Sequence, residues 1–360
     1  MAESPIREDG GLHFRVAFED WAHVSSSLVA EGAQARLPLV TVAIPTYRRL
    51  PLLVEAVQSL LHQRFDRDFE ILIVDNDPAS EVAQHLLERV PELRGRNFRY
   101  FVNPENLGMF GNWNRCLELA RSEWVTILND DDLLDANYLK LMFASIDAAP
   151  SIDGLVCRKR YLDMRERAAP PAPVTSRIKW RRRIGQLIRF PLYAVHFGGA
   201  QTRRLRARQF FWGPVAGAPL GFIFRRRCAV DVGGFYPEEH PASDTWFFAR
   251  FSARYHLRQH RLAAGSSRIL ENESAKPATA AASLRSVYRL QQALVGGQAP
   301  RWWLRFAPLV LARLRRSAEG AFEMRVADAE LAGEIPVAPD RPHRLAIIRL
   351  LCNGWHPDPV

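Results

Sequence analysis

Between residues 39 and 128, short apolar runs alternate with longer stretches whose apolar residues recur at helical spacing. Short runs rich in Val, Ile and Phe are typical of buried strands. They are Leu39–Ile44, Phe69–Val74, Phe98–Val102 and Trp124–Leu128. The helical patterns are Leu52–Leu61, Glu81–Arg89 and residues 109–121. Strands that alternate with helices predict an α/β fold with a Rossmann-like, mostly parallel sheet flanked by helices.

Polar residues follow each of these expected strands at its carboxyl end. The four groups are Thr46–Arg48, Asp75–Asp77, Asn103–Asn106 and Asp130–Asp132. In open parallel sheets, ligands bind in the crevice beyond the carboxyl ends of the strands. This edge of the sheet is therefore predicted to carry the functional site.

The most acidic of the four groups is the triplet Asp130, Asp131 and Asp132. Carboxylates packed this closely raise one another's pKa, and a cation relieves the repulsion. Clustered oxygen ligands suit Mg²⁺ or Mn²⁺, and Mg²⁺ is commonly shared between one or two carboxylates and substrate phosphates. The alternative is a solvated acidic turn that caps a helix from about Asp135. The strand-end position favours a metal site, while the identity of the direct ligands within the triplet stays open.

The charge of the chain limits the classes of protein to which it can belong. Its 360 residues include 49 Lys and Arg against 39 Asp and Glu, a net charge of +10. Nearly all of the positive charge is arginine, concentrated in residues 177–189, 203–208 and 301–316, which favours contact with phosphate or anionic lipid. No recognisable nucleic-acid-binding module accompanies the charge, so nucleic acid is not an expected partner. No apolar run is long enough to span a bilayer, which predicts a soluble or peripheral protein.

Beyond about Pro150 the alternation stops. Residues 165–183 are rich in Pro and Arg and predict a loop or linker. Regular patterns return with a strand over Ala218–Phe224, a helix over Ser243–Tyr255 and a mostly helical tail from Leu284. The four cysteines lack metal-binding spacing, so neither a zinc site nor a disulfide framework is expected, and a reduced setting fits best.

Four motifs occur in a fixed order between about residues 39 and 275. The first two are Val42–Arg48 and Ile71–Asp77. The third is Asn103–Gly108 with Asn112 and Asn114, which runs into the acidic triplet, and the fourth combines Gly221–Arg225, Val232–Phe235 and Ser243–Trp246. Together they resemble family 2 glycosyltransferases of the GT-A fold, especially bacterial enzymes that build capsule or O-antigen sugars. The order of the motifs, more than any one of them, carries the resemblance.

This resemblance implies donor-binding roles for the residues at the strand ends. Arg48 would approach the ribose or diphosphate of the donor, the alternative being a solvated loop residue. Asp75 would accept a hydrogen bond from the base. Asn106 and Gly108 would bring a helix N-terminus close to the phosphates. The base pocket would be lined by Pro45, Thr46 and Tyr47.

The resemblance also implies a metal-bound diphosphate. Asp130 would contact the donor, and two of Asp130, Asp131 and Asp132, with the choice left open, would hold Mg²⁺ or Mn²⁺. Several relatives carry a metal- or diphosphate-binding histidine on a loop where this chain has Leu270. Its absence implies that Arg268 supplies the positive charge of that loop.

Asp244 matches the catalytic base of the family. In an inverting displacement it would take the proton of the acceptor hydroxyl as the oxygen attacks the anomeric carbon. Relatives often have a second acidic residue immediately before the base, where this chain has Ser243. Glu238 and Glu239 are the nearest substitutes. The alternative for Asp244 is a helix-capping residue.

The activity implied is that of an inverting, metal-dependent glycosyltransferase. The donor would be a UDP- or dTDP-sugar, and the acceptor a glycan or a lipid-linked sugar in surface polysaccharide synthesis, on a cytoplasmic enzyme that is peripheral at the inner membrane face. A nucleotidyltransferase is an alternative, but it needs a glycine-rich loop that Ile44–Arg48 lacks. A non-catalytic nucleotide-sugar or membrane-binding scaffold would need neither the triplet nor Asp244.

The chain is expected to divide into four parts. These are an N-terminal extension (1–37), a nucleotide-sugar-binding half (38–150), an acceptor-binding half (151–275) and a helical C-terminal region (276–360). Two stretches, 178–212 and 301–316, mix Trp, Phe and Arg as interfacial helices do. They predict either contact with an anionic membrane or buried helices with a charged outer face.

Overall fold

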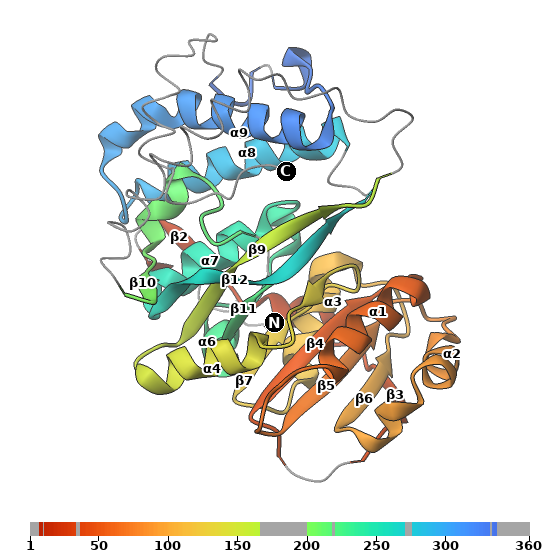
Figure 1. Ribbon diagram of the computed structural model, residues 1–360. Coiled ribbons are helices and arrows are strands. Elements are labelled where there is room, and N and C mark those ends of the chain that lie inside the picture. Colours follow the sequence, from red (N-terminus) through yellow and green to blue (C-terminus); the bar gives the residue numbers. More distant parts are fainter. Residues whose placement is uncertain are drawn as a thin grey trace, which may run out of the picture.

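The computed structural model describes residues 7–9, 11–33, 37–165, 200–217, 220–270, 276–331 and 333–336. Figure 1 shows an α/β half, two long neighbouring strands and a pair of C-terminal helices. Nearly all of the predicted loop over residues 165–183 lies outside the described residues. The stretch 178–199 and the end of the predicted C-terminal region, 337–360, lie outside them as well.

Four parallel strands form the centre of the α/β half. They are β4 (Val40–Thr46), β5 (Phe69–Asp75), β6 (Phe98–Val102) and β7 (Trp124–Ile127). The connecting elements are α1 (Leu50–Leu61), α2 (Val82–Arg89), η2 (Pro91–Gly95) and α3 (Gly108–Leu119). The strands lie in the order β7–β4–β5–β6, so β4 pairs with both β5 and β7. The direction of winding reverses between β4 and β7, and ligands bind at the carboxyl ends of strands at such a switch point.

The sheet continues beyond β7 with strands from the second half of the chain. β11 (Phe222–Arg225) runs antiparallel to β7 and to β9 (Gly154–Asp163), and β9 is parallel to β12 (Leu257–Ile269). Three short strands complete it: β8 (Leu133–Leu134), β10 (Thr202–Arg204) and, at the opposite edge beside β6, β3 (Ser27–Glu31). The helices of this half are α4 (Tyr138–Ala148), α6 (Arg226–Asp231) and α7 (Ser243–Arg254). The predicted α/β sheet flanked by helices is confirmed, with antiparallel strands added on both sides.

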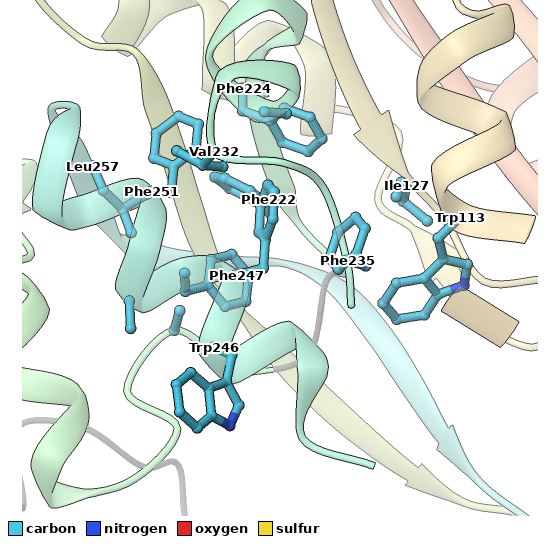
Figure 2. Close-up of a cluster of buried hydrophobic side chains, with 14 of the residues drawn as sticks. Trp113, Ile127, Phe222, Phe224, Val232, Phe235, Trp246, Phe247, Phe251 and Leu257 are labelled. Carbon is cyan, nitrogen blue, oxygen red and sulfur yellow. The ribbon is translucent and has the colours of Figure 1, made fainter. Parts of the chain in front are cut away.

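Buried side chains pack on both faces of the sheet. Along β4, Ala43 joins an aromatic-rich core on one face, and Val42 and Ile44 join a second core on the other. A strand without an exposed face has a continuous apolar sequence, which explains the run that predicted β4. In the aromatic-rich core, drawn in Figure 2, Phe247 of α7 stacks on Phe235 with ring centroids 4.3 Å apart. This packing fixes the start of α7 relative to the sheet.

The N-terminal segment is part of the fold. It contains β1 (Arg7–Asp9), β2 (Leu12–Phe14) and the 3-10 turn η1 (Ala17–Trp21). Ala17 N donates to Gly233 O at 3.1 Å, and Tyr236 Oη donates to Arg15 O at 2.8 Å. Arg115 of α3 donates to Trp21 O at 2.9 Å. The segment therefore ties α3 to the loop 233–236, which leads into the turn η4 (Pro237–Glu239) and α7.

The C-terminal part of the described chain is helical, as predicted. Helices α8 (Pro277–Leu294) and α9 (Ala307–Phe322) lie side by side (Figure 1) and share a small apolar core. The short turns η6 (Arg301–Phe306) and η7 (Asp328–Glu330) flank α9, and η3 (Ala207–Trp212) packs against α8. None of the helices in the described ranges is long and apolar enough to cross a bilayer.

Asn114 of α3 is expected to be a stability determinant. Its Nδ2 donates to Phe235 O at 2.7 Å and its Oδ1 accepts from Phe235 N at 2.8 Å, in a fully buried setting. Asn114→Ala leaves both backbone groups without partners, so the free energy of unfolding should fall by about 2–4 kcal/mol in urea titration. Lys140→Ala, exposed on α4, is the control and should change it by less than about 0.5 kcal/mol. Equal effects of the two variants would contradict the prediction.

Candidate active site

The end of β4 and the residues that follow β7 meet at the switch point. Thr46 Oγ1 donates to Asp130 Oδ2 at 2.8 Å. Asp130 is 6% exposed, and burial raises the pKa of its carboxyl to about 6, an effect that Arg49 and the Thr46 bond partly offset. The carboxyl is thus held by β4, while its negative charge is only partly compensated.

One guanidinium group joins the first two carboxyls of the triplet. Arg49 Nη1 lies 3.1 Å from Asp131 Oδ2 and 3.5 Å from Asp130 Oδ1. Arg49 is more exposed than either carboxylate, with 43% of its side chain accessible. Its charge stands where a divalent cation would also be favourable. Nothing in the sequence distinguishes Arg49 from the neighbouring Arg48 as a partner of the triplet.

Asp132 has a different set of partners. Asn129 Nδ2 donates to Asp132 Oδ2 at 3.2 Å, and the backbone N of Arg268 donates to Oδ1 at 3.1 Å. Burial raises the pKa of Asp132 to about 6, and the charge of Lys159 partly offsets this rise. The three carboxyls therefore do not point at one common partner.

The triplet fits a hard cation that shares its ligands with a phosphate-bearing substrate. Asp130 and Asp132 are buried carboxyls with raised pKa values, so both are stabilised by added positive charge. Within the described ranges, no three His, Cys, Asp or Glu side chains are arranged to hold a metal by themselves. Mg²⁺ commonly takes one or two protein carboxylates and completes its shell with phosphate and water. The donor set is therefore suitable for a metal that binds together with its substrate.

Asp75 at the end of β5 is fully buried and bonded within the protein. Tyr100 Oη donates to Asp75 Oδ2 at 2.6 Å, Ser80 Oγ donates to the same oxygen, and Asp77 N donates to Oδ1 at 3.0 Å. Burial and the nearby Asp75 carboxylate raise the pKa of Tyr100 well above its usual range. A base could therefore reach Asp75 only if one of these partners gave way.

The loop after β4 presents an aromatic ring and a guanidinium group at the surface. Pro45 is buried inside β4, whereas Tyr47 is 39% exposed. Arg48 has a left-handed backbone (φ 57°), stacks over the Tyr47 ring at 4.9 Å and binds Asp77 through Nε at 2.6 Å. This ion pair lowers the pKa of Asp77. Arg48 is thus held beside the crevice by Asp77, a residue whose function the sequence left open.

A network of asparagines shapes the loop that leads into α3. Asn76 Nδ2 donates to Asn106 Oδ1 at 2.7 Å, and Asn103 Nδ2 donates to Asn76 Oδ1 at 3.0 Å. Asn106 Oδ1 also accepts from Gly108 N at 2.9 Å, and Gly108 has a φ of 70°, which favours glycine. Asn112 accepts from Asn103 at 3.0 Å and completes the network. Asn76 and Asn103 lie within the predicted strand-end groups, but the sequence assigned neither of them a role of its own, because asparagine at a strand end is also an ordinary turn residue.

Arg268 lies near the end of β12, close to the triplet. Its backbone N binds Asp132, and its Nη2 donates to Glu55 Oε2 of α1 at 2.6 Å. The Arg268 side chain is 4% exposed, whereas that of Glu55 is 54% exposed. The residue therefore joins α1, the triplet and β12, and its charge is already paired in this structure.

Asp244 is the second residue of α7, and Ala242 holds the N-cap position. Asp244 Oδ1 accepts from Thr245 N at 2.6 Å and from Thr245 Oγ1 at 3.2 Å. Burial raises the pKa of Asp244 to about 6, and Lys159 again offsets part of the rise. Lys159 of β9 is therefore a cationic neighbour shared by Asp132 and Asp244. The sequence carried no signal for Lys159, because a lysine in a strand is usually an ordinary surface residue.

The two possible substitutes for Asp244 are engaged in ion pairs. Glu238 accepts from Arg15 Nε at 2.7 Å. Burial raises the pKa of Glu239 to about 7, and its carboxyl binds the fully buried Arg250. Of these three carboxylates, Asp244 alone has no arginine partner among the described residues.

A family model described as "Glycosyl transferase family 2" matches residues 41–212, from β4 to η3. This part of the chain belongs to glycosyltransferase family 2. The match contains every candidate residue from Pro45 to Asp132, together with Lys159, whereas Asp244 and Arg268 lie beyond it. The roles assigned to individual residues stay predictions.

Three curated relatives extend the comparison. An uncharacterized protein of Mycobacterium tuberculosis, MT1568, is 27% identical over 65% of this chain and 70% of its own length. The putative colanic acid biosynthesis glycosyl transferase WcaA of Escherichia coli is 31% identical over 30% of this chain and 37% of WcaA. The GalNAc(5)-diNAcBac-PP-undecaprenol beta-1,3-glucosyltransferase of Campylobacter jejuni is 35% identical over 27% of this chain and 31% of that enzyme. The aligned part thus spans only about a third of the last two proteins.

Two solved structures share the fold of this protein. S. aureus TarS in complex with UDP superposes with a TM-score of 0.53 at 16% identity, over 86% of this chain and 82% of TarS. The mannosyltransferase PcManGT from Pyrobaculum calidifontis, in complex with GDP-Man and Mn²⁺, gives a TM-score of 0.50 at 21% identity, over 93% of this chain and 86% of PcManGT. At these identities the likeness concerns the fold, and the predicted GT-A fold is confirmed.

The raised pKa of Asp130 predicts a measurable cost to the stability of the protein without added metal. Because the folded pKa of about 6 exceeds that of the unfolded chain, the carboxyl destabilises the fold increasingly as pH rises from about 4 to about 6. Asp130→Asn removes this cost while keeping an oxygen that accepts from Thr46. At pH 7 without metal, the variant should therefore be more stable by about 1–3 kcal/mol in urea titration.

Added Mn²⁺ should reverse this order. Millimolar Mn²⁺ with UDP should raise the melting temperature of the wild-type protein and raise that of Asp130→Asn much less. Asp66→Asn, an exposed substitution after α1, is the control and should behave as wild type. Equal metal-dependent shifts in wild type and Asp130→Asn would remove Asp130 from the metal site.

Proposed function

We propose that this protein is an inverting, metal-dependent glycosyltransferase. It would transfer a sugar from a nucleoside-diphosphate donor to a glycan or lipid-linked acceptor in surface polysaccharide synthesis. The observation that carries the proposal is the set of three carboxyls Asp130, Asp132 and Asp244. Burial raises the pKa of each to about 6, and Lys159 is a common neighbour of the last two. Carboxyls with perturbed pKa values are a mark of a reaction site, and Asp130 and Asp132 follow β7 at the switch point of the sheet.

The donor would lie beyond the carboxyl ends of β4 and β5. The exposed ring of Tyr47 offers a stacking surface for a base, and Arg48 beside it offers positive charge for ribose or phosphate. Asp75 would bind the base imide after exchanging its bond from Ser80 or Tyr100. We favour a UDP- or dTDP-sugar. Support comes from TarS, whose structures contain UDP and UDP-GlcNAc, while PcManGT contains GDP-Man.

The metal would be Mg²⁺ or Mn²⁺, held by Asp130 with Asp131 or Asp132. When bound, it would supply positive charge that stabilises the departing diphosphate. Arg49 would release its contacts with Asp130 and Asp131 and turn toward the phosphates. The oxygen-only donor set of the triplet and the Mn²⁺ in the PcManGT structure support this assignment.

Asp244 would act as the general base. Its carboxyl would accept the proton of the acceptor hydroxyl while the hydroxyl oxygen forms the new glycosidic bond and the diphosphate leaves from the opposite side. A base with a pKa of about 6 is largely ionised at pH 7 yet still basic enough to accept a proton. Lys159 would help to keep Asp244 ionised in its buried setting.

The acceptor is proposed from the relatives. The Campylobacter jejuni enzyme is named for an undecaprenol-linked acceptor, WcaA for colanic acid synthesis and the Rhizobium meliloti relative ExoO for succinoglycan synthesis. These names support a polysaccharide or lipid-linked sugar as the acceptor class.

Asp244→Asn tests the proposed base directly. It removes the proton acceptor but leaves the triplet intact, so turnover should fall by about 10²- to 10⁴-fold. Calorimetry with UDP and Mn²⁺ should give unchanged binding, and Asp66→Asn should keep full turnover. If Asp244→Asn transfers sugar at the wild-type rate, Asp244 is not the base. If the variant also loses UDP binding, its role lies in donor binding or folding.

Lys159→Met tests the electrostatic coupling between β9 and α7. Lys159 lowers the pKa of Asp244, so its removal raises that pKa and moves the acidic limb of the pH–rate profile to higher pH. The measurement is kcat/KM from about pH 5 to 8, with Lys140→Met, on the exposed face of α4, as control. A uniform loss of rate without a shift of the limb would argue against this role.

A further inference from the structure

The fold brings two arginine-rich segments together beside the C-terminal helices. Residues 200–217 contain four arginines, residues 295–317 contain five, and neither segment contains Asp or Glu. Trp212 of η3 packs against Trp303 and Phe306 of η6, with ring centroids 5.0 Å and 5.8 Å apart. Arg313 Nη2 also donates to Trp212 O at 3.1 Å. In Figure 1, β10, which leads into η3, lies at the same side of the molecule as one end of α8 and α9.

The aromatic residues of η6 divide between two environments. Trp303 and Phe306 are partly buried against Trp212, whereas Trp302 is 56% exposed. The Trp302 ring rests 5.9 Å from the Phe306 ring, so it is supported by the packed residues beneath it. Arg301 and Arg305 are exposed on either side of Trp302 in the sequence. The turn η6 therefore exposes a large aromatic ring and two arginine side chains.

Both segments carry exposed arginines, and the packing of Trp212 on Trp303 and Phe306 places the two segments next to each other. The Arg–Trp face comprises Arg204, Arg206, Arg208, Arg301, Trp302 and Arg305. No carboxylate of the described residues lies within ion-pair distance of these five arginines, whereas Arg315 at the other side of α9 pairs with Glu319 and Asp328. Uncompensated charge of one sign on a surface is favourable for an anionic partner.

We propose that the Arg–Trp face binds the surface of an anionic lipid bilayer. Arginine binds lipid phosphates, and tryptophan is favoured at the depth of the headgroups, where its ring is half in an apolar setting. A polyphosphate or a nucleic-acid duplex would satisfy the arginines but offers no apolar layer for the exposed ring of Trp302. The association is peripheral and depends on charge and on one aromatic anchor. It goes beyond the proposed transfer reaction and holds whether or not that reaction occurs.

The test is co-sedimentation of the full chain with vesicles, without donor or acceptor. Wild type should bind vesicles of phosphatidylcholine with about one third phosphatidylglycerol, bind pure phosphatidylcholine far less, and dissociate as salt rises. Arg301→Gln/Arg305→Gln should weaken binding about ten- to thirty-fold, since each arginine near an anionic surface contributes about five-fold. Trp302→Ala should weaken it several-fold. The matched control, Arg64→Gln/Arg89→Gln, removes the same charge from exposed positions in the α/β half and should bind as wild type.

Three outcomes would overturn the proposal. The first is equal binding of wild type to neutral and anionic vesicles, and the second is equal weakening by the η6 and control double variants. The third is tight binding to duplex DNA together with vesicle binding that Trp302→Ala leaves unchanged, which would make the face a general polyanion site. Circular dichroism melts of all variants show that each is folded before binding is measured. Because the assay contains no nucleotide sugar, failure of the transfer reaction does not affect its outcome.

Discussion

The arrangement of the candidate site depends on one topological constraint, the pairing of β4 with both β5 and β7. The connections that follow β4 and β7 run in opposite directions along the sheet, so the crevice at the carboxyl ends of these two strands stays open to a ligand. The bond from Thr46 to Asp130 joins the two strand ends across this point. Because the same hydrophobic packing that orders the strands also buries Asp130 and Asp132, their pKa values rise to about 6. The carboxyls of the triplet are thus buried at a cost in stability, which is a common feature of functional sites.

Positive side chains around the triplet moderate that cost. Arg49 contacts Asp130 and Asp131, and Lys159 acts on Asp132 from β9. Arg49 follows β4 in the parallel half of the sheet, and Lys159 lies in β9 of the antiparallel extension. Both halves therefore contribute positive charge near the triplet. Lys159 also acts on Asp244. Lys159 is therefore a neighbour both of Asp132, in the triplet proposed to bind the metal, and of Asp244, proposed to act on the acceptor. This shared neighbour is the structural reason to propose that the two halves of the chain form one reaction site.

The sequence predicted the features that have local signals. Buried parallel strands are continuous apolar runs, and the strands from β4 to β7 begin and end within two residues of their predicted limits. The acidic triplet and the strand-end polar groups followed from the same pattern. No local sequence pattern indicates the contacts between segments that are distant in the chain. Arg15 meets Tyr236 across 221 positions of sequence, and neither residue type indicates the other. The full burial of Asp75 likewise depends on Tyr100 and Ser80, which become its partners only once β5 and β6 are paired and the loop after β5 has folded back.

Composition alone leaves two interpretations of residues 301–316 open: contact with a membrane, or a buried helix with a charged outer face. The positions of the individual side chains separate the two. Periodicity cannot decide between a buried helix with a charged outer face and an interfacial one, since both place aromatic and charged residues at helical spacing. In the structure, Trp303 and Phe306 are partly buried against Trp212, while Trp302 is 56% exposed. The partly buried rings thus support the exposed one. A rigidly held anchor loses little conformational entropy on contact with a surface. The short turn η6 would therefore suffice for the proposed membrane contact, where a flexible tail would need more residues.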